Sequence, residues 1–204
     1  MEKLKFRTIS SNQETNLFLK KIENHTEVRL PLNYATNGKI VGVFIHKQLV
    51  AGYMLITKPG FRSLLFVPEK IKNSHRLFLK DQYEMMEVNG LWISPTVKTP
   101  HMQYKIWINL VKDIFFSRKK YLLLMCDANN KTIEHIHSLT SPEPLYEGKP
   151  NIMAGEKTHT SIRVSYTTRW NIVLNIPKYW MELKSRERRA KESARQRDLA
   201  RTST

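Results

Sequence analysis

A turn rich in polar side chains joins a β-rich segment to an amphipathic one at residues 93–107, ISPTVKTPHMQYKIW. Where a protein binds a phosphorylated ligand, such a strand-to-helix junction is usually rich in glycine, because glycine lets backbone N–H groups approach the phosphates. This junction runs from Lys98 to Gln103 without a glycine. The residues leave three interpretations open: a phosphate-binding turn that has lost its glycines, a turn adapted to another ligand, or an ordinary loop.

Other reactive side chains are few. Cys126 ends an apolar run, YLLLMC, where an acyl-cysteine is conceivable but a small buried residue is the simpler interpretation. His135 and His137 are two positions apart, so on a helix they would point in different directions and make a poor pair of metal ligands. His101 is isolated from other ligand types. We therefore expect no metal site.

The formal net charge of +16 is the strongest compositional signal. It predicts affinity for an anionic partner and says nothing about fold, so nucleic acid, an anionic membrane surface and an acidic protein such as an acyl carrier protein all remain possible. Residues 178–204 carry nine Lys or Arg against four Asp or Glu, which is a net +5. Subtraction leaves +11 for the rest, so the chain is basic even without this segment.

The length of 204 residues suits one domain with an extension. The single cysteine excludes an intramolecular disulfide framework. The first residues, MEKLKFRTIS, lack the apolar core of a signal peptide, and no apolar run approaches the ~18 residues of a membrane span. These features predict a soluble, cytoplasmic protein.

The spacing of apolar residues predicts an α+β fold. Ser11 and Glu14 form a capping box that begins a helix. Polar residues 46–48 divide two β-rich runs, which predicts a hairpin. Further strands are expected at 3–9, 61–68 (or as a continuation of the hairpin), 84–95, 119–128 and, once or twice, 159–176. Helices are expected from Pro100 and at 129–139, a polar connector with a helical turn at 69–82, and a loop at 141–151.

This order, with two local motifs, resembles the GNAT superfamily of N-acyltransferases over residues 36–148. Its donor-binding turn has the form V-x-P-x-x-R-x-x-G-x-G. Ile93-Ser94-Pro95 fits the first element, Lys98 stands for arginine, and His101 and Gln103 stand for the two glycines. A second motif, N-x-x-A-x-x-x-Y, is matched by Asn130, with Ile133 and His137 in place of alanine and tyrosine.

The resemblance implies a GNAT-like fold: a mixed, mostly antiparallel central sheet flanked by helices over residues 1–180, followed by a basic helical or disordered tail at 181–204. It implies that the donor is acyl-CoA or an acyl-phosphopantetheine, used as a substrate. The donor's phosphates would lie on the turn formed by Lys98, Thr99, Pro100, His101, Met102 and Gln103, and its pantetheine arm would pair with the main chain of Leu91, Trp92 and Ile93, near Asn130.

The same resemblance places Glu87 where several relatives carry a general base, because an amine must be neutral to attack a thioester. A solvated or ion-paired strand glutamate is the alternative. His137 takes the place of the tyrosine that protonates the leaving thiolate, although the residues themselves favour a solvated histidine on a helix. Trp92 could face the acyl pocket or the core.

We expect an N-acyltransferase in which an amine attacks an acyl thioester directly. The missing glycines and the +16 charge favour an acyl carrier protein as donor, because its arm carries one phosphodiester and its surface is acidic. The alternative is a nucleic-acid-binding or adaptor protein on an inactive GNAT-like scaffold. The segment RERRAKESARQR could bind nucleic acid or an anionic membrane, although its interleaved glutamates favour a merely solvated helix.

Overall fold

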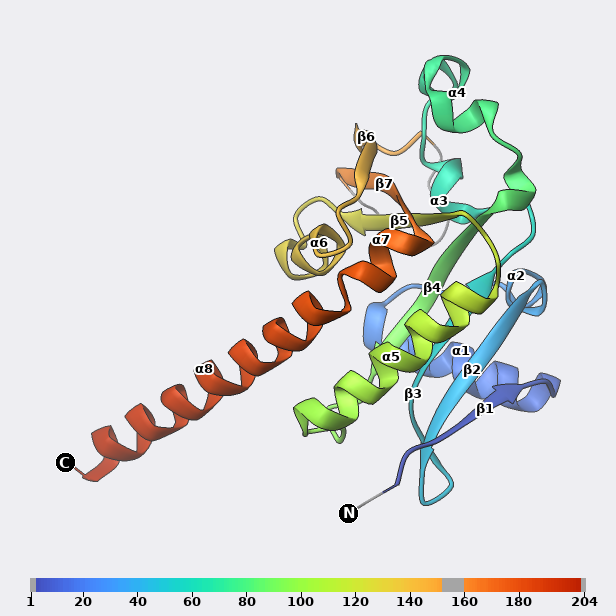
Figure 1. The fold of residues 1–204 in the computed structure, drawn as a ribbon. Helices are drawn as coiled ribbons and strands as arrows, with labels where there is room; N and C mark the ends of the chain where they lie inside the picture. The colour runs from blue at the N-terminus through green and yellow to red at the C-terminus, as the bar shows by residue number, and fades with distance from the viewer. Residues whose placement is uncertain (1–2, 152–159, 203–204) are drawn as a thin grey trace.

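The computed structural model describes residues 3–151 and 160–202, and its centre is a mixed sheet (Figure 1). The described strands follow the order β1-β2-β3-β4-β5-β7-β6. Every neighbouring pair is antiparallel except β4 and β5, which are parallel. The strands are β1 (Lys5–Ile9), β2 (Gly38–Ile45), β3 (Gln48–Ile56), β4 (Met85–Ile93), β5 (Tyr121–Asp127), β6 (Glu143–Gly148) and β7 (Ile162–Thr168).

Local signals account for the first elements. Helix α1 (Asn12–Thr26) begins at the predicted cap, where the Ser11 side chain accepts a hydrogen bond from the Glu14 N–H. The β2–β3 hairpin turns through His46 and Lys47, whose φ angles of 45° and 68° give the left-handed conformation that suits the strand twist. A short helix, α2 (Leu32–Thr36), joins α1 to β2.

Helices cover both faces of the sheet (Figure 1). On one face, α1, α2 and α3 (Arg62–Leu65) pack around a cluster that contains Phe18, Ile22 and Met54. On the other face, α5 (Pro100–Phe116) and α7 (Arg169–Leu174) pack around Tyr53, Leu110 and Ile172. The other described helices are α4 (Glu69–Ser74), the 3-10 turns η1 (Arg76–Leu79) and η2 (Gln82–Glu84), α6 (Lys131–Ser138) and α8 (Ile176–Thr202).

Strands β4 and β5 pair only over Met85–Glu87 and Tyr121–Leu123, and beyond these residues they diverge (Figure 1). The β3–β4 register shifts between Gly52 and Met54, opposite Gly90, whose φ is +59°. A Cβ at Gly90 would lie 2.3 Å from Ile22 Cδ1, so the close approach of α1 requires glycine here. The divergence opens the middle of the sheet.

Three local expectations were wrong. Residues 62–65 form α3 instead of a strand, and residues 143–148 form β6 instead of a loop. Strand β6 lies at the sheet edge, where Pro144 is tolerated because an edge strand leaves some N–H positions unpaired. The β-branched and aromatic run after β7 turns into α7 because the Thr168 side chain caps it, accepting from the Asn171 N–H at 3.2 Å.

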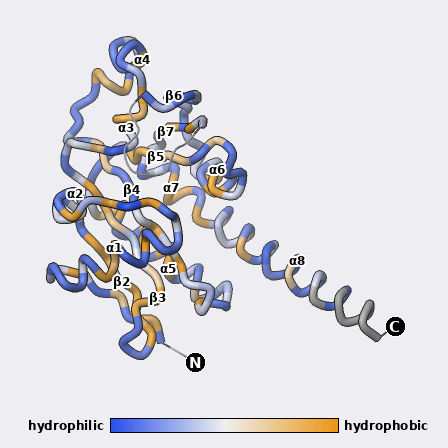
Figure 2. The backbone as a smooth tube through the Cα atoms, turned by 180° about the vertical axis from the view of Figure 1, so that it is seen from behind, coloured by the Kyte–Doolittle hydropathy of each residue, from blue (hydrophilic) through white to orange (hydrophobic). Residues whose placement is uncertain are grey.

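The C-terminal segment is one long helix, α8, and the expected boundary at 180/181 falls inside it. Its first turns pack on α5, where Tyr179 stacks on Trp107 and Trp180 lies 4.7 Å from Tyr104 between ring centroids. Beyond them α8 leaves the body of the protein and is mostly hydrophilic (Figures 1 and 2). The expected division into domain and tail stays a prediction.

Candidate functional site

A cavity of about 350 Å³ lies where β4 and β5 diverge. Six elements surround it: the two strands, α5, α6, α7 and the start of α8. Its walls are mainly apolar, which suits a ligand with a hydrocarbon part. The apolar lining consists of Val88, Leu91, Ile93, Trp107, Leu110, Val111, Ile114, Leu122, Leu124, Met125, Ile133, Ile136 and Ile172.

A few polar groups interrupt this lining: Asn89, His137, Thr140 and Tyr179. Burial lowers the pKa of His137 to about 4, so its imidazole is neutral near pH 7. The Thr140 hydroxyl donates to the His137 carbonyl at 2.7 Å and fixes the end of α6. A neutral imidazole can donate or accept one hydrogen bond at each nitrogen, but it carries no proton that it readily gives up.

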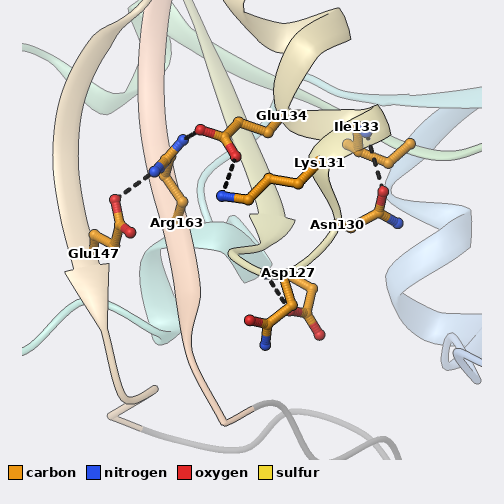
Figure 3. Close-up of polar contacts among 8 residues, drawn as sticks. Asp127, Asn130, Lys131, Ile133, Glu134, Glu147 and Arg163 are labelled. Atoms are coloured by element: carbon orange, nitrogen blue, oxygen red, sulfur yellow. Dashed lines mark hydrogen bonds and ion pairs between the residues drawn. The ribbon is translucent and has the colours of Figure 1, made fainter.

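Helix α6, which carries His137, is held at its beginning by Asn130 (Figure 3). The Asn130 Oδ1 accepts a hydrogen bond from the Ile133 N–H at 3.1 Å. Arg163 of β7 binds Glu134 of α6 and, at 2.8 Å, Glu147 of β6, and both partners raise its pKa (Figure 3). This arginine clamps the helix to the edge of the sheet and so positions His137 over the cavity.

Glu87 is buried, 3% exposed, at the point where β4 and β5 last pair. Its carboxylate accepts hydrogen bonds from the backbone N–H groups of Arg62 (2.9 Å) and Ser63 (3.1 Å), from the Ser63 hydroxyl (2.7 Å) and from the Tyr34 hydroxyl. Four donors fill the usual sites of an ionised carboxylate. The side chain therefore anchors α2 and α3 to β4, on the face opposite α5.

Tyr34 connects this buried carboxylate to the cavity wall. Its hydroxyl donates to Glu87 and accepts from Asn89 Nδ2 at 3.1 Å. Asn89 lines the cavity, while Tyr34 is half-buried between α2 and β4. Burial, followed by the charge of Glu87, raises the pKa of Tyr34 well above its ordinary value. The phenol is thus a protonated link between the two residues.

In the first part of the turn between β4 and α5, backbone N–H groups form hydrogen bonds within the turn itself. Val97 donates to the Ser94 carbonyl at 2.9 Å and Lys98 to the Thr96 carbonyl at 3.0 Å. The Thr96 N–H donates to the Ser94 hydroxyl at 3.3 Å. Val97 itself is buried against β2 and β3. These N–H groups stabilise the turn, so they are not free to surround a diphosphate.

The second part of the turn begins α5. The Thr99 side chain caps the helix, accepting from the Met102 N–H at 3.2 Å, and Pro100 occupies the first helical position, which requires no N–H. Gln103 reaches back and donates to the Val97 carbonyl at 3.0 Å. Lys98 and His101 are exposed on the outside of this turn. The side chain at 103 thus has a structural role that glycine could not fill.

Solved structures with the same arrangement of elements are acyltransferases, although no family model and no curated protein sequence matches the chain. An N-acyl amino acid synthase from uncultured soil microbes aligns with a TM-score of 0.58 and 11% identity, over 88% of this chain and 94% of the other. An N-acetyltransferase from Staphylococcus aureus Mu50 aligns with a TM-score of 0.54 and 10% identity, over 82% and 99%.

A Bacillus subtilis acetyltransferase in complex with CoA aligns with a TM-score of 0.50 and 9% identity, over 81% of this chain and 99% of the other. The chain has the GNAT fold. The expected mixed, mostly antiparallel sheet flanked by helices is confirmed. At these identities the likeness establishes the fold alone.

The expected donor residues of this GNAT fold occupy three places. Leu91 and Ile93 line the cavity, and Asn130 lies at the start of α6. Trp92 also borders the cavity, but its ring packs against His25 of α1 at 4.9 Å between centroids, so the indole belongs to the core on the other face. The turn residues, Lys98 to Gln103, lie at the start of α5.

The structure also brings in residues that sequence reasoning missed. Tyr34 and Asn89 had no spacing or motif to mark them, because Tyr34 meets Glu87 and Asn89 only through the packing of α2 on β4. Tyr179 stood at the edge of an expected tail and instead lines the cavity. Cys126 is buried, and its pKa is raised chiefly by burial, which makes it a poor nucleophile.

Within residues 3–151 and 160–202, no group of three His, Cys, Asp or Glu side chains gathers as a possible metal-binding cluster. Among the described helices, none is both long enough and apolar enough to cross a membrane.

Proposed function

We propose that the protein is an N-acyltransferase that moves an acyl chain from a thioester to an amine. The observation that carries the proposal is the apolar cavity of about 350 Å³ between the diverging strands of a GNAT fold. An engineered apolar cavity of ~150 Å³ holds benzene, so this volume suits a chain of roughly a dozen carbon atoms. We infer a medium or long acyl chain in preference to an acetyl group.

The reaction forms a bond between the amine nitrogen and the acyl carbon and breaks the bond from that carbon to sulfur. We propose that the amine approaches at Asn89 from the side of α2. Its proton passes to the Tyr34 oxygen while Tyr34 gives its own proton to Glu87, since the two are already hydrogen-bonded. In this scheme Glu87 is the final proton acceptor, and one of its four hydrogen bonds rearranges.

His137 has a different role from the one that the resemblance implied. With a pKa of about 4, its imidazole is neutral near pH 7 and is a poor source of a full proton for the leaving thiolate. We propose that its N–H donates a hydrogen bond to the thioester within the cavity. The thiolate is then protonated by water.

The donor is the phosphopantetheine arm of an acyl carrier protein in preference to CoA. Two features support this choice. The turn N–H groups of Val97 and Lys98 bond within the turn instead of facing a diphosphate. The exposed side chains around them include Lys98, His101 and Lys105. A basic surface at the donor's entrance attracts an acidic carrier protein more than it selects a nucleotide.

The test is a transfer assay with acyl-CoA and acyl carrier protein at matched concentrations, with a panel of amino acids and amines, read by mass spectrometry. We expect N-acylated products, more from the carrier-protein donor, and a loss of transfer in Leu110→Phe, which fills the cavity. The control Leu174→Phe changes an exposed leucine, 73% exposed, and should leave transfer unchanged. No product from any donor and amine would refute the proposal, and equal turnover of both donors would refute the donor preference.

A further inference from the structure

A second, smaller hollow lies directly behind one wall of the apolar cavity. It measures about 20 Å³, roughly the space for a single water, and lies between α5, α6 and α8. The two hollows share three wall residues: Trp107, Ile136 and Tyr179. Glu182, Leu183 and Arg186 of α8 also line the smaller hollow. The three shared side chains therefore separate the two hollows.

Tyr179 is the part of this partition that comes from α8. It is 7% exposed, and its ring stacks on Trp107 with centroids 5.8 Å apart and planes 15° apart. Neighbouring contacts fix the helix on both sides: Trp180 packs on Tyr104 at 4.7 Å, and Glu182 binds His135 of α6 at 3.2 Å. The phenol ring is thus held across the gap between α5 and α6.

We propose that Tyr179 sets the largest hydrocarbon chain that the cavity admits. Removing its ring joins the two hollows, because Tyr179 borders both of them. The freed space is about that of a benzene ring, so the enlarged cavity accepts a chain longer by about four carbons. That this chain is the acyl group of a donor rests on the proposed function, whereas its binding in the cavity does not.

The test measures binding alone. A series of straight-chain fatty acids, from hexanoate to hexadecanoate, displaces 1-anilinonaphthalene-8-sulfonate from the full-length protein. In Tyr179→Ala the tightest-binding chain is expected to be longer than in the wild type by about four carbons. Tyr179→Phe keeps the ring, so its binding should depend on chain length as in the wild type. Met181→Ala changes an exposed side chain of α8, which is 61% exposed and lines neither hollow, and keeps the wild-type chain-length profile.

A more conservative variant, Tyr179→Leu, guards against loss of folding in the alanine variant, and thermal unfolding identifies the folded proteins. A wild-type chain-length profile in folded Tyr179→Leu overturns the inference, as does an equal shift in Met181→Ala. The proposed function fails separately. If the chain-length profile shifts but no protein transfers an acyl group, the size limit set by Tyr179 stands and the proposed acyl transfer is wrong. If transfer occurs and the chain-length profile does not shift, the proposed acyl transfer stands and the size limit is wrong.

Discussion

The Tyr34 hydroxyl donates a hydrogen bond to the buried carboxylate of Glu87 and so joins α2 to the end of the β4–β5 pairing. The same oxygen accepts from Asn89, which lines the cavity. A carboxylate with four donors is an anchor for the fold. It can also take up a proton, provided that the proton arrives through one of those donors. Tyr34 is the donor that reaches the cavity wall.

Tyr34→Phe is therefore expected to slow acyl transfer by about 10²-fold, since it removes the proton path and keeps the aromatic ring. The measurement is the rate of transfer at saturating donor and amine. Tyr53→Phe is the matched control, because Tyr53 is also a buried tyrosine that donates to a carboxylate, Asp113, at 2.7 Å, and it does not line the cavity. It should lower stability by about 1 kcal/mol and spare the rate. Equal rates in the wild type and Tyr34→Phe would exclude the relay.

Glu87→Gln has two expected effects. The amide keeps one acceptor oxygen but turns its NH₂ toward the N–H group of either Arg62 or Ser63, because the two bond to different oxygens, and this costs about 1–3 kcal/mol in the free energy of unfolding. It also removes the proton acceptor, so transfer falls between about pH 6 and pH 9. Chemical denaturation and the pH–rate profile separate the two effects. A folded variant with the wild-type rate over this range shows that Glu87 is only an anchor.

Burial of His137 predicts a dependence of stability on pH. The folded-state pKa of about 4 lies below the ordinary value of ~6.5, so the unfolded chain binds the proton more readily. Stability from this group is fully present above about pH 6.5 and is lost as pH falls toward 4, by at most about 3 kcal/mol. Urea titrations at several pH values measure the loss.

The control for this prediction uses two histidine variants. His137→Gln should flatten the dependence between about pH 6.5 and pH 4, because the buried titrating group is gone. His101→Gln changes an exposed histidine at the start of α5 and should keep the wild-type dependence. The same slope in the wild type and His137→Gln would show that other groups govern acid stability.

Local chemistry made much of this fold predictable from the sequence. Ser11 and Glu14 marked the first helix, the apolar spacing after Pro100 marked α5, and the apolar run ending at Cys126 marked β5. The junction at residues 93–103 was also correctly placed between a strand and a helix. These signals lie within a few residues of the structure that they specify, so they could be read without knowledge of the packing.

The rest depended on contacts between distant residues. Glu87 is buried because its partners come from Tyr34 and from the start of α3, and nothing in the local sequence reveals either contact. No motif marked Tyr179, at the end of the expected domain, yet it completes the cavity wall through its stacking on Trp107. The cavity wall and the hydrogen bonds of the proposed proton path both depend on such long-range packing.

The outer part of α8 provides the last prediction. Past Arg186 the helix forms ion pairs along its own length, such as Lys191 with Glu187, and exposed pairs of this kind contribute little to stability. A chain that ends at Arg186 keeps Tyr179 and Leu183 buried, so its free energy of unfolding and its transfer rate should match the wild type to within about 1 kcal/mol and about twofold.

A chain that ends at Asn175 is the contrasting variant, because it loses both buried side chains and should be less stable by about 3 kcal/mol or more. Binding of duplex DNA at two salt concentrations tests the remaining role of the tail. Truncation after Arg186 removes six Lys or Arg and three Asp or Glu, which lowers the net charge by 3. If salt-sensitive DNA binding disappears in this variant, the binding belongs to the outer part of α8. Loss of stability or transfer in the Arg186 variant would instead show that the outer helix docks on the catalytic body.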